Sequence, residues 1–183
     1  MLLLPFVGYS QTSHYPICDS CEVVEHENYS LCYNEKYEQA SWVFYELTKD
    51  EVAGDLERTD DFREDPLVSK GSASLEDYVG SGYDRGHIAP AADMEFSVTA
   101  MSESFYMSNM SPQHPSFNRG RWKSLEGEVR KWAYSRESIW VTSGPVLKGE
   151  LQTIGENQVA VPEYYYKVLL DSIHQTCVAF LLP

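Results

Sequence analysis

The chain has 183 residues, of which 43% are hydrophobic, so it can form one globular domain with a buried core and is too short for two domains of ordinary size. The formal net charge of -14 argues against attraction of a polyanion by the surface as a whole. No stretch reaches the ~20 apolar residues of a membrane-spanning helix, and we expect no membrane partner.

The predicted elements begin with two strands. Residues 29–33 alternate in polarity and residues 40–47 are rich in aromatic and branched side chains, so we expect them to pair in a sheet. Residues 50–82 are acidic and show no sustained period, which indicates a largely irregular segment. A short helix is predicted for residues 97–104, with Ser97 as its cap.

The second half continues with a strand at residues 105–110 that ends before Pro112. A helix is predicted for residues 117–135, because apolar side chains recur there at helical spacing. They are Trp122, Leu125, Val129, Trp132 and Ala133. A strand at residues 138–143 and a hairpin with arms 164–170 and 176–182 complete the pattern.

Positive charge is concentrated in one segment, residues 105–136, which carries six Lys and Arg against two Asp and Glu. The parts before and after this segment are net acidic. A solvated helix face would give the same pattern by itself. The segment is therefore a candidate phosphate-binding surface only in combination with the motifs below. Its basic residues are Arg119, Arg121, Lys123, Arg130, Lys131 and Arg136.

The chain begins with an apolar stretch, residues 1–11, that is followed by small and polar residues. This is typical of the end of a secretory signal, although the positively charged start is missing. We predict a secreted or periplasmic protein with an N-terminal segment at residues 1–28, containing a signal-peptide remnant, and a single domain at residues 29–183. The apolar end at Pro183 suggests truncation at the C-terminus.

Four cysteines occur, at Cys18, Cys21, Cys32 and Cys177. The close pair Cys18 and Cys21 fits half of a zinc site or a redox motif, but a four-thiolate zinc site usually has a second close pair, and none is present. We expect a local disulfide between them if the protein is exported, and simple burial of Cys32 and Cys177 in strand-like runs.

The run Tyr83-Asp84-Arg85-Gly86-His87, followed by Asn118 and Glu126, contains the groups needed for metal-assisted cleavage of a phosphodiester. His87 can accept a proton at neutral pH, because an unperturbed imidazole titrates near ~6.5. Asn118 offers Mg²⁺ a hard oxygen ligand, compatible with capping its helix, and Glu126 can accept hydrogen bonds from waters of the ion. The two lie near one edge of the predicted helix, two turns apart.

These residues belong to a longer pattern of four motifs in order. The motifs are Arg58-Thr59-Asp60-Asp61-Phe62-Arg63-Glu64-Asp65-Pro66, Gly80-Ser81-Gly82-Tyr83-Asp84-Arg85-Gly86-His87-Ile88-Ala89-Pro90, Ser108-Asn109-Met110-Ser111-Pro112-Gln113, and Asn118 with Trp122, Leu125, Glu126 and Arg130. With them the chain resembles the DNA/RNA non-specific endonucleases of the ββα-metal (His-Me finger) superfamily, from about Tyr29 to its end.

The resemblance implies an α+β fold, mixed, with a mainly antiparallel sheet core and a ββα-metal finger that carries the active site. It implies hydrolysis of DNA and RNA to 5'-phosphate and 3'-hydroxyl ends, with Mg²⁺ as the cofactor and Mn²⁺ as a substitute. DNA and RNA are the implied partners, and the oligomeric state stays open, with a homodimer as one option.

The resemblance also implies roles for single residues. His87 matches the general base, and Asn118 matches the only direct protein ligand to magnesium. Glu126 matches the carboxylate that anchors metal-bound water, and Arg58 matches an arginine that stabilises the pentavalent phosphate.

Three further residues match the shell of the active site. Asn109 matches an asparagine beside the catalytic histidine, and Arg85 and Arg130 match arginines of the shell. The acidity of the chain and its end at Pro183 depart from the pattern.

Two alternatives stay open. The first is a nuclease-like fold that binds nucleic acid or a partner without cleavage, although the intact set of His87, Asn118, Glu126 and Arg58 argues against it. The second is a cysteine-dependent hydrolase using Cys177 or Cys32, or a zinc protein built on Cys18 and Cys21. Chelation should abolish activity of the nuclease, and thiol alkylation that of the cysteine enzyme.

Overall fold

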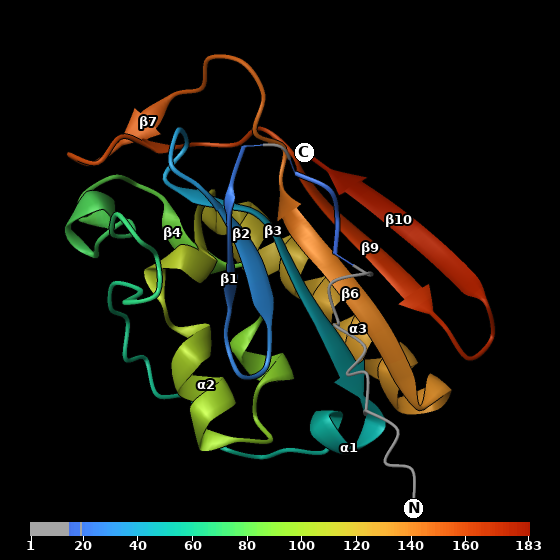
Figure 1. The fold of residues 1–183 in the computed structure, drawn as a ribbon. Coiled ribbons are helices and arrows are strands. Elements are labelled where there is room, and N and C mark those ends of the chain that lie inside the picture. Colours follow the sequence, from blue (N-terminus) through green and yellow to red (C-terminus); the bar gives the residue numbers. More distant parts are fainter. Residues whose placement is uncertain (1–14, 19) are drawn as a thin grey trace, which may run out of the picture.

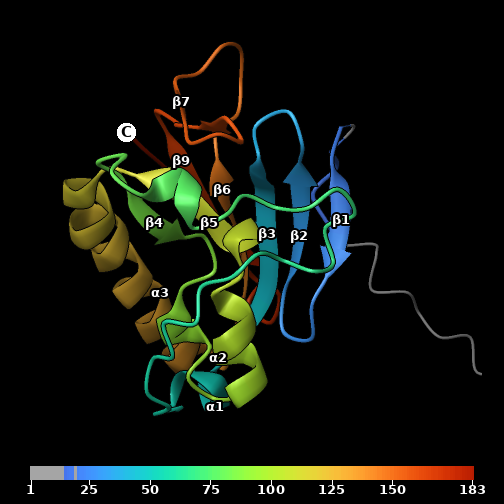
Figure 2. The ribbon, with the colours of Figure 1, turned by 90° about the vertical axis from the view of Figure 1, so that its left-hand side faces the viewer.

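The computed structural model describes residues 15–18 and 20–183, and its central element is a six-stranded sheet with helices on one face (Figures 1 and 2). The strand order is β1-β2-β3-β6-β9-β10, and each neighbouring pair is antiparallel. The strands are β1 (Glu22–Glu25), β2 (Ser30–Asn34), β3 (Gln39–Thr48), β6 (Ser138–Pro145), β9 (Tyr165–Asp171) and β10 (Thr176–Leu182). The predicted α+β fold with a mainly antiparallel sheet is confirmed.

One face of the sheet carries the three α-helices and a separate two-stranded ribbon (Figure 2). The helices are α1 (Lys49–Val52), α2 (Val98–Ser104) and α3 (Lys123–Arg136), and the ribbon pairs β4 (Asp84–His87) with β5 (Met110–Gln113). Ser97 caps α2 as predicted, since its side chain accepts a hydrogen bond from the Ala100 N–H. In the described residues, no helix is long and apolar enough to cross a bilayer.

The core lies between α3 and the inner face of the sheet. Val129 and Ala133 of α3 are buried, as is the preceding Trp122, and they join a cluster that includes Val141 and Leu169. The remaining predicted apolar positions of the helix, Leu125 and Trp132, pack against the same cluster. The 3.6-residue period of the sequence therefore identified the buried face of this helix.

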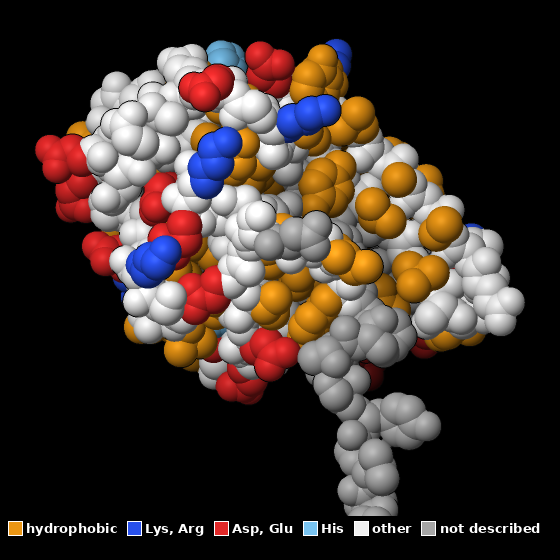
Figure 3. Space-filling model, turned by 45° about the horizontal axis from the view of Figure 1, so that its top comes forward, with side chains coloured by type: hydrophobic (Ala, Val, Ile, Leu, Met, Phe, Trp, Pro, Cys, Tyr) orange, Lys and Arg blue, Asp and Glu red, His pale blue; other side chains and the backbone are white. Residues whose placement is uncertain are grey.

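The opposite face of the sheet is not covered by a helix of the described chain, and apolar side chains gather there (Figure 3). Leu170 of β9 is 40% exposed and Leu181 of β10 is 63% exposed. Cys177 pairs with Leu170 across the hairpin and is exposed, so the expectation that it is buried is wrong. The strand that contains Cys177 is an edge strand of the sheet. Alternation of polar and apolar residues in the sequence does not show that another layer covers such a strand. Cys32, in contrast, is buried.

The sequence misplaced one strand and missed four others. Residues 107–109 form a 3₁₀ turn, and the strand is β5, which includes Pro112. Proline is tolerated in β5 because this strand forms a two-stranded ribbon with β4 and therefore has one open edge, where a missing backbone N–H breaks no hydrogen bond between strands. The missed strands are β4, β1 inside the predicted segment 1–28, and the short ribbon of β7 (Thr153–Ile154) and β8 (Val159–Ala160). The apolar stretch at residues 1–11 lies outside the described residues.

Gly86 is required by the packing of the β4–β5 ribbon, and its replacement should be costly. A Cβ atom at this position would overlap the side chain of Gln113, which is fully buried. We expect Gly86→Ala to lower the free energy of unfolding by about 1–3 kcal/mol, the range for overpacking. The measurement is urea unfolding followed by circular dichroism.

Gly127 of α3 provides the matched control for this substitution. A Cβ atom there would meet only the Arg130 Nη2 atom, at 3.9 Å. Gly127→Ala should therefore raise the free energy of unfolding by about 1 kcal/mol through helix propensity. Equal effects of the two substitutions would contradict the packing argument.

Candidate active site

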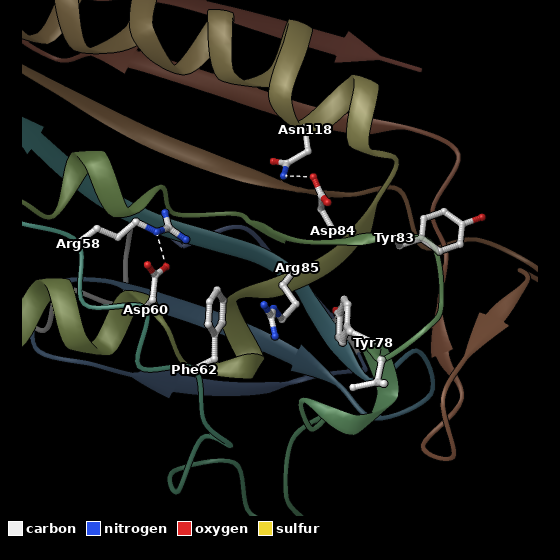
Figure 4. Close-up of a pocket in the computed structure, with 9 residues that line it drawn as sticks. Arg58, Asp60, Phe62, Tyr78, Tyr83, Asp84, Arg85 and Asn118 are labelled. Carbon is white, nitrogen blue, oxygen red and sulfur yellow. Dashed lines mark hydrogen bonds and ion pairs between the residues drawn. The ribbon is translucent and has the colours of Figure 1, made fainter.

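A cavity of about 440 Å³ lies between the irregular loop at residues 58–62, strand β4 and the start of the long helix (Figure 4). It contains three of the residues singled out from the sequence, Arg58, Arg85 and Asn118. The complete lining is Arg58, Asp60, Phe62, Tyr78, Val79, Tyr83, Asp84, Arg85 and Asn118. Residues from distant parts of the chain thus meet in one open space.

Asn118 is held at the cavity by Asp84 of β4. The Asn118 Nδ2 donates a hydrogen bond of 2.9 Å to Asp84 Oδ2, and the guanidinium of Arg119 binds both oxygens of the same carboxylate, at 2.9 and 2.6 Å (Figure 4 shows the Asn118 bond). These contacts, with that of Arg119 first, lower the pKa of Asp84. With its amide nitrogen engaged, Asn118 keeps its amide oxygen available for a ligand.

A π-helical turn at Phe117–Trp122 precedes α3 and changes the register of the helix. A π-helical turn contains one residue more than an α-helical turn. The eight residues from Asn118 to Glu126 therefore rotate around the helix axis by about as much as seven α-helical residues. This rotation is close to two turns of 3.6 residues each. The turn places Asn118 and Glu126 more nearly in line than the uninterrupted helix predicted from the sequence.

His87 ends strand β4 and is 8% exposed. Its ring packs edgewise against Phe62 and Phe105, with centroid distances of 5.8 and 4.9 Å. The Nε2 atom is buried and has no hydrogen-bond partner within the described chain. The backbone carbonyl of His87 accepts a hydrogen bond of 3.3 Å from the Trp122 indole, which ties β4 to the helix.

The charge state of His87 differs from that of a free imidazole. Burial, and then the positive charges of Arg58 and Arg85, lower its pKa to about 3. The value near ~6.5 assumed from the sequence does not apply to the folded chain. His87 is therefore neutral throughout the physiological pH range.

Arg58 and Arg85 lie on the two sides of the cavity and are held in different ways. The Arg58 guanidinium lies 4.7 Å from the centroid of the Phe105 ring and donates a hydrogen bond of 2.5 Å to Asp60 (Figure 4). The Arg85 guanidinium lies 4.2 Å from the Phe62 ring and forms no ion pair with the described residues. The neighbouring carboxylate of Asp84 binds Arg119.

Asn109 is fully buried and joins the chain segments around His87. Its Nδ2 donates to the carbonyls of Ala89 and Ser104, at 2.9 and 2.8 Å, and its Oδ1 accepts from the Ala89 N–H at 2.9 Å. Both amide hydrogens are used, so Asn109 fixes the backbone that follows His87 and does not line the cavity.

Glu126 and Arg130 lie on α3 outside the lining of this cavity. Arg130 donates a hydrogen bond of 2.7 Å to Asp93, which also accepts one of 2.7 Å from the Tyr45 hydroxyl. Glu126 is partly buried, accepts no hydrogen bond from the described residues, and burial raises its pKa to about 8. The sequence gave no indication of Asp93, because its neighbours in the chain carry no charge pattern.

The basic segment is largely neutralised by local partners. Arg119, Arg130, Lys131 and Arg136 each form an ion pair with a described carboxylate. Arg121 and Lys123 are exposed and have no such partner in residues 15–18 and 20–183. They are the free positive charges that follow Asn118 along the helix.

The cysteines lie away from the cavity. The sulfur atoms of Cys18, Cys21 and Cys32 lie within 4.8 Å of one another, against the outer face of the sheet. Cys21 is in disulfide contact with both others, with Cα–Cα distances of 6.3 Å to Cys18 and 5.4 Å to Cys32. Both distances suit a disulfide, and one sulfur forms one such bond at a time. A Cys21–Cys32 disulfide is thus an alternative to the local Cys18–Cys21 disulfide expected from the sequence.

The oxygen donor that Asn118 offers at the cavity suits a magnesium ion. Asn118 has a neutral amide oxygen oriented by Asp84, and Glu126, outside the cavity lining, has no hydrogen-bond partner in the described chain. Mg²⁺ prefers hard oxygen ligands and keeps several of its waters. The residues present therefore fit this ion.

Comparison with known proteins identifies the family. The family model described as DNA/RNA non-specific endonuclease matches residues 8–181. The chain belongs to this family. A solved crystal structure of the EndoG/EndoGI complex is 33% identical, with a TM-score of 0.78, and the match covers 88% of this chain and 73% of that one.

Curated relatives of this chain include mitochondrial nuclease EXOG of Mus musculus, 38% identical over 81% of the chain and 44% of the relative. Human mitochondrial endonuclease G is 36% identical over 87% of the chain and 58% of its own length. Nuclease C1 of Cunninghamella echinulata var. echinulata is 40% identical over 81% and 65%. The chain spans about half the length of the curated relatives it matches.

The expectation of a secreted or periplasmic protein is contradicted by these comparisons. The relatives EXOG of mouse and of human and endonuclease G of human are mitochondrial nucleases rather than secreted ones. An apolar N-terminal stretch without a positive start was insufficient ground for predicting export.

The shifted titration of His87 is directly measurable by NMR of the ring nitrogens in the metal-free protein. We expect a pKa of about 3, because the buried ring lies beside two guanidinium groups. The unfolded chain takes up this proton near ~6.5, so the contribution of His87 to stability falls as the pH is lowered from there through the folded value. Titration of His87 near neutral pH would contradict the assignment.

Proposed function

We propose that the chain is a metal-dependent, sugar-nonspecific endonuclease that hydrolyses phosphodiester bonds in DNA and RNA to 5'-phosphate and 3'-hydroxyl ends. The observation that carries the proposal is the meeting of Asn118, Arg58 and Arg85 in one cavity beside a buried, neutral His87. The β4–β5 ribbon followed by the helix is consistent with a ββα-metal finger. The curated relatives are nucleases, which supports the same reaction.

Asn118 would hold a divalent ion through its amide oxygen, and Glu126 would accept hydrogen bonds from the water around it. Bound there, Mg²⁺, or Mn²⁺ as a substitute, would offset charge on the phosphate and make water more acidic. Asp84 orients Asn118 for this task by occupying its amide nitrogen. Removal of Asn118 should therefore weaken dependence on the metal.

His87 is the proposed general base. Because Nε2 is buried, Nδ1 is the ring nitrogen that accepts the proton of the attacking water. A pKa of about 3 makes a weak base, but part of the lowering comes from Arg58 and Arg85. A phosphate bound between these arginines offsets their charge, so the base becomes stronger when substrate is present.

Arg58 is proposed to stabilise the charge that develops on the phosphate, and Arg85 to position it. Arg85 is already free of carboxylates, whereas Arg58 must exchange Asp60 for a phosphate oxygen. Contacts to phosphate carry no sequence information, so little base preference is expected. The relatives support a mitochondrial location for this activity.

The direct test is digestion of a plasmid and of an RNA, each with Mg²⁺ and with a chelator. We expect both substrates to be cleaved only with the metal. His87→Ala should lower turnover by about 100- to 10,000-fold, the range for a lost general base. Thermal unfolding of the variant monitors its fold. A folded His87→Ala protein with near-normal turnover would refute the role of the imidazole.

Arg121 and Lys123 should contribute to binding by neutralising phosphates. Replacing both with Ala in a chelated sample should weaken duplex DNA binding. It should also make the plot of log affinity against log salt less steep, by about 0.9 for each phosphate that is no longer neutralised. Lys148→Ala, at an exposed position in another part of the chain, is the control. An unchanged salt dependence of the double variant would show that these charges do not face the substrate.

A further inference from the structure

Three cysteine sulfur atoms meet on the outer face of the sheet, outside the proposed active site. The sulfur atoms of Cys18, Cys21 and Cys32 all lie within 4.8 Å of one another. Cys32 belongs to β2 and is fully buried, whereas Cys21 directly precedes β1 and, like Cys18, is half-buried. The sheet therefore brings a third thiol to the close pair that is visible in the sequence.

A disulfide can use only two of these three sulfur atoms. The Cα atom of Cys21 lies 6.3 Å from that of Cys18 and 5.4 Å from that of Cys32, so Cys21 can bond to either partner but not to both. Each of the two disulfides leaves one thiol of the cluster unused. A metal ion, in contrast, can bind all three sulfur atoms at once.

The spacing of the three thiols suits zinc. Cys18 and Cys21 are separated by two residues, as in many zinc-binding pairs, and Cys32 adds a ligand from the strand that pairs with β1. Zinc–sulfur bonds of ~2.3 Å at tetrahedral angles separate the sulfur atoms by about 3.8 Å, and the three atoms lie within 4.8 Å. Thiolates are soft ligands that select zinc, whereas Mg²⁺ prefers oxygen ligands.

The side chains around the cluster also suit a metal-bound thiolate. Cys32 is packed with Trp42 and Phe44, and Cys18 and Cys21 pack against this group. The indole N–H of Trp42 is buried and has no hydrogen-bond partner in the described chain. A buried donor without a partner costs free energy, and a thiolate in the same group of side chains would supply an acceptor. Donors of this kind orient and tune the ligands of metal ions.

We propose that Cys18, Cys21 and Cys32 form a zinc site, in which three thiolates bind the ion and water occupies the fourth position. Binding releases the three thiol protons to solvent, because the thiolate is the form that binds metal. The carboxylate of Glu22, the residue after Cys21, instead accepts hydrogen bonds from the N–H and the hydroxyl of Ser69. The ion would tie the start of β1 to β2 and so stabilise this edge of the sheet.

The test titrates the full chain with Co²⁺, after anaerobic purification with reduced thiols and removal of bound metal. Co²⁺ is the probe because its thiolate complexes absorb in the near ultraviolet and its tetrahedral complexes absorb in the visible range. We expect one Co²⁺ per chain with both absorptions, and we expect Zn²⁺ to displace it. A reduced protein that binds no Co²⁺, or binds it without thiolate absorption, would overturn the proposal. This measurement needs no variant.

Substitutions test each part of the site. Cys32→Ser should weaken Zn²⁺ binding by more than the ~10- to 100-fold typical of a lost outer-shell partner, and Trp42→Phe should weaken it within that range. Cys177→Ser is the matched control and should bind Zn²⁺ like the unmodified protein, because Cys177 is exposed on β10 at the other edge of the sheet. Equal Zn²⁺ affinities of Cys32→Ser and Cys177→Ser would contradict the site.

Mass spectrometry decides between the ion and a disulfide in the protein as isolated. Isolated anaerobically from the cytosol of zinc-supplemented cells, the native protein should have the mass of the chain plus one zinc, less the displaced protons. A Cys18–Cys21 or Cys21–Cys32 disulfide without zinc in this preparation would overturn the proposal.

The zinc site is separate from the proposed nuclease activity. After a chelator has removed all metal, Mg²⁺ alone should restore the cleavage of DNA, because thiolates do not bind this ion well. Absence of cleavage would refute the proposed function and leave the Co²⁺ titration to decide the zinc site.

Discussion

The carboxylate of Asp84 is the point on which the geometry of the site depends. It accepts hydrogen bonds from Asn118 and from Arg119, so it joins the start of the helix to the strand that ends in His87. The Trp122 indole reinforces this junction by binding the His87 carbonyl. Strand and helix are thereby fixed relative to each other, which sets the position of the Asn118 amide oxygen at the cavity and of the His87 imidazole at the end of β4.

Burial gives the titratable residues their special properties. His87 lies among aromatic rings and two guanidinium groups, which keep it neutral, whereas Glu126 is a half-buried residue of α3 with a raised pKa. In both cases desolvation is the largest cause, and neighbouring charges modify it. The acid–base behaviour of the site therefore depends on the helix remaining packed on the sheet as much as on the reacting groups themselves.

The acidity of the chain affects the site through competition between charges. Asp60 pairs with Arg58, Asp84 with Arg119 and Asp93 with Arg130, so three of the cations in and around the site already have partners. Arg85, Arg121 and Lys123 lack ion-pair partners in the described part of the chain. In a protein with a net charge of -14, the proposed binding of phosphate therefore depends on a small number of available cations.

The sequence by itself determined the main strands of the sheet, the buried face of the long helix and the identity of key residues that line the cavity, because periodicity and local motifs depend on near neighbours. It could not predict that Asn109 fixes the backbone at Ala89 or that Asp84 binds Asn118. Those interactions join segments 20 or more residues apart, as in the Asn118–Asp84 bond. The π-helical turn, the exposure of Cys177 and the pKa of His87 were likewise decided by the tertiary structure, since each depends on which surfaces are covered and which charges meet.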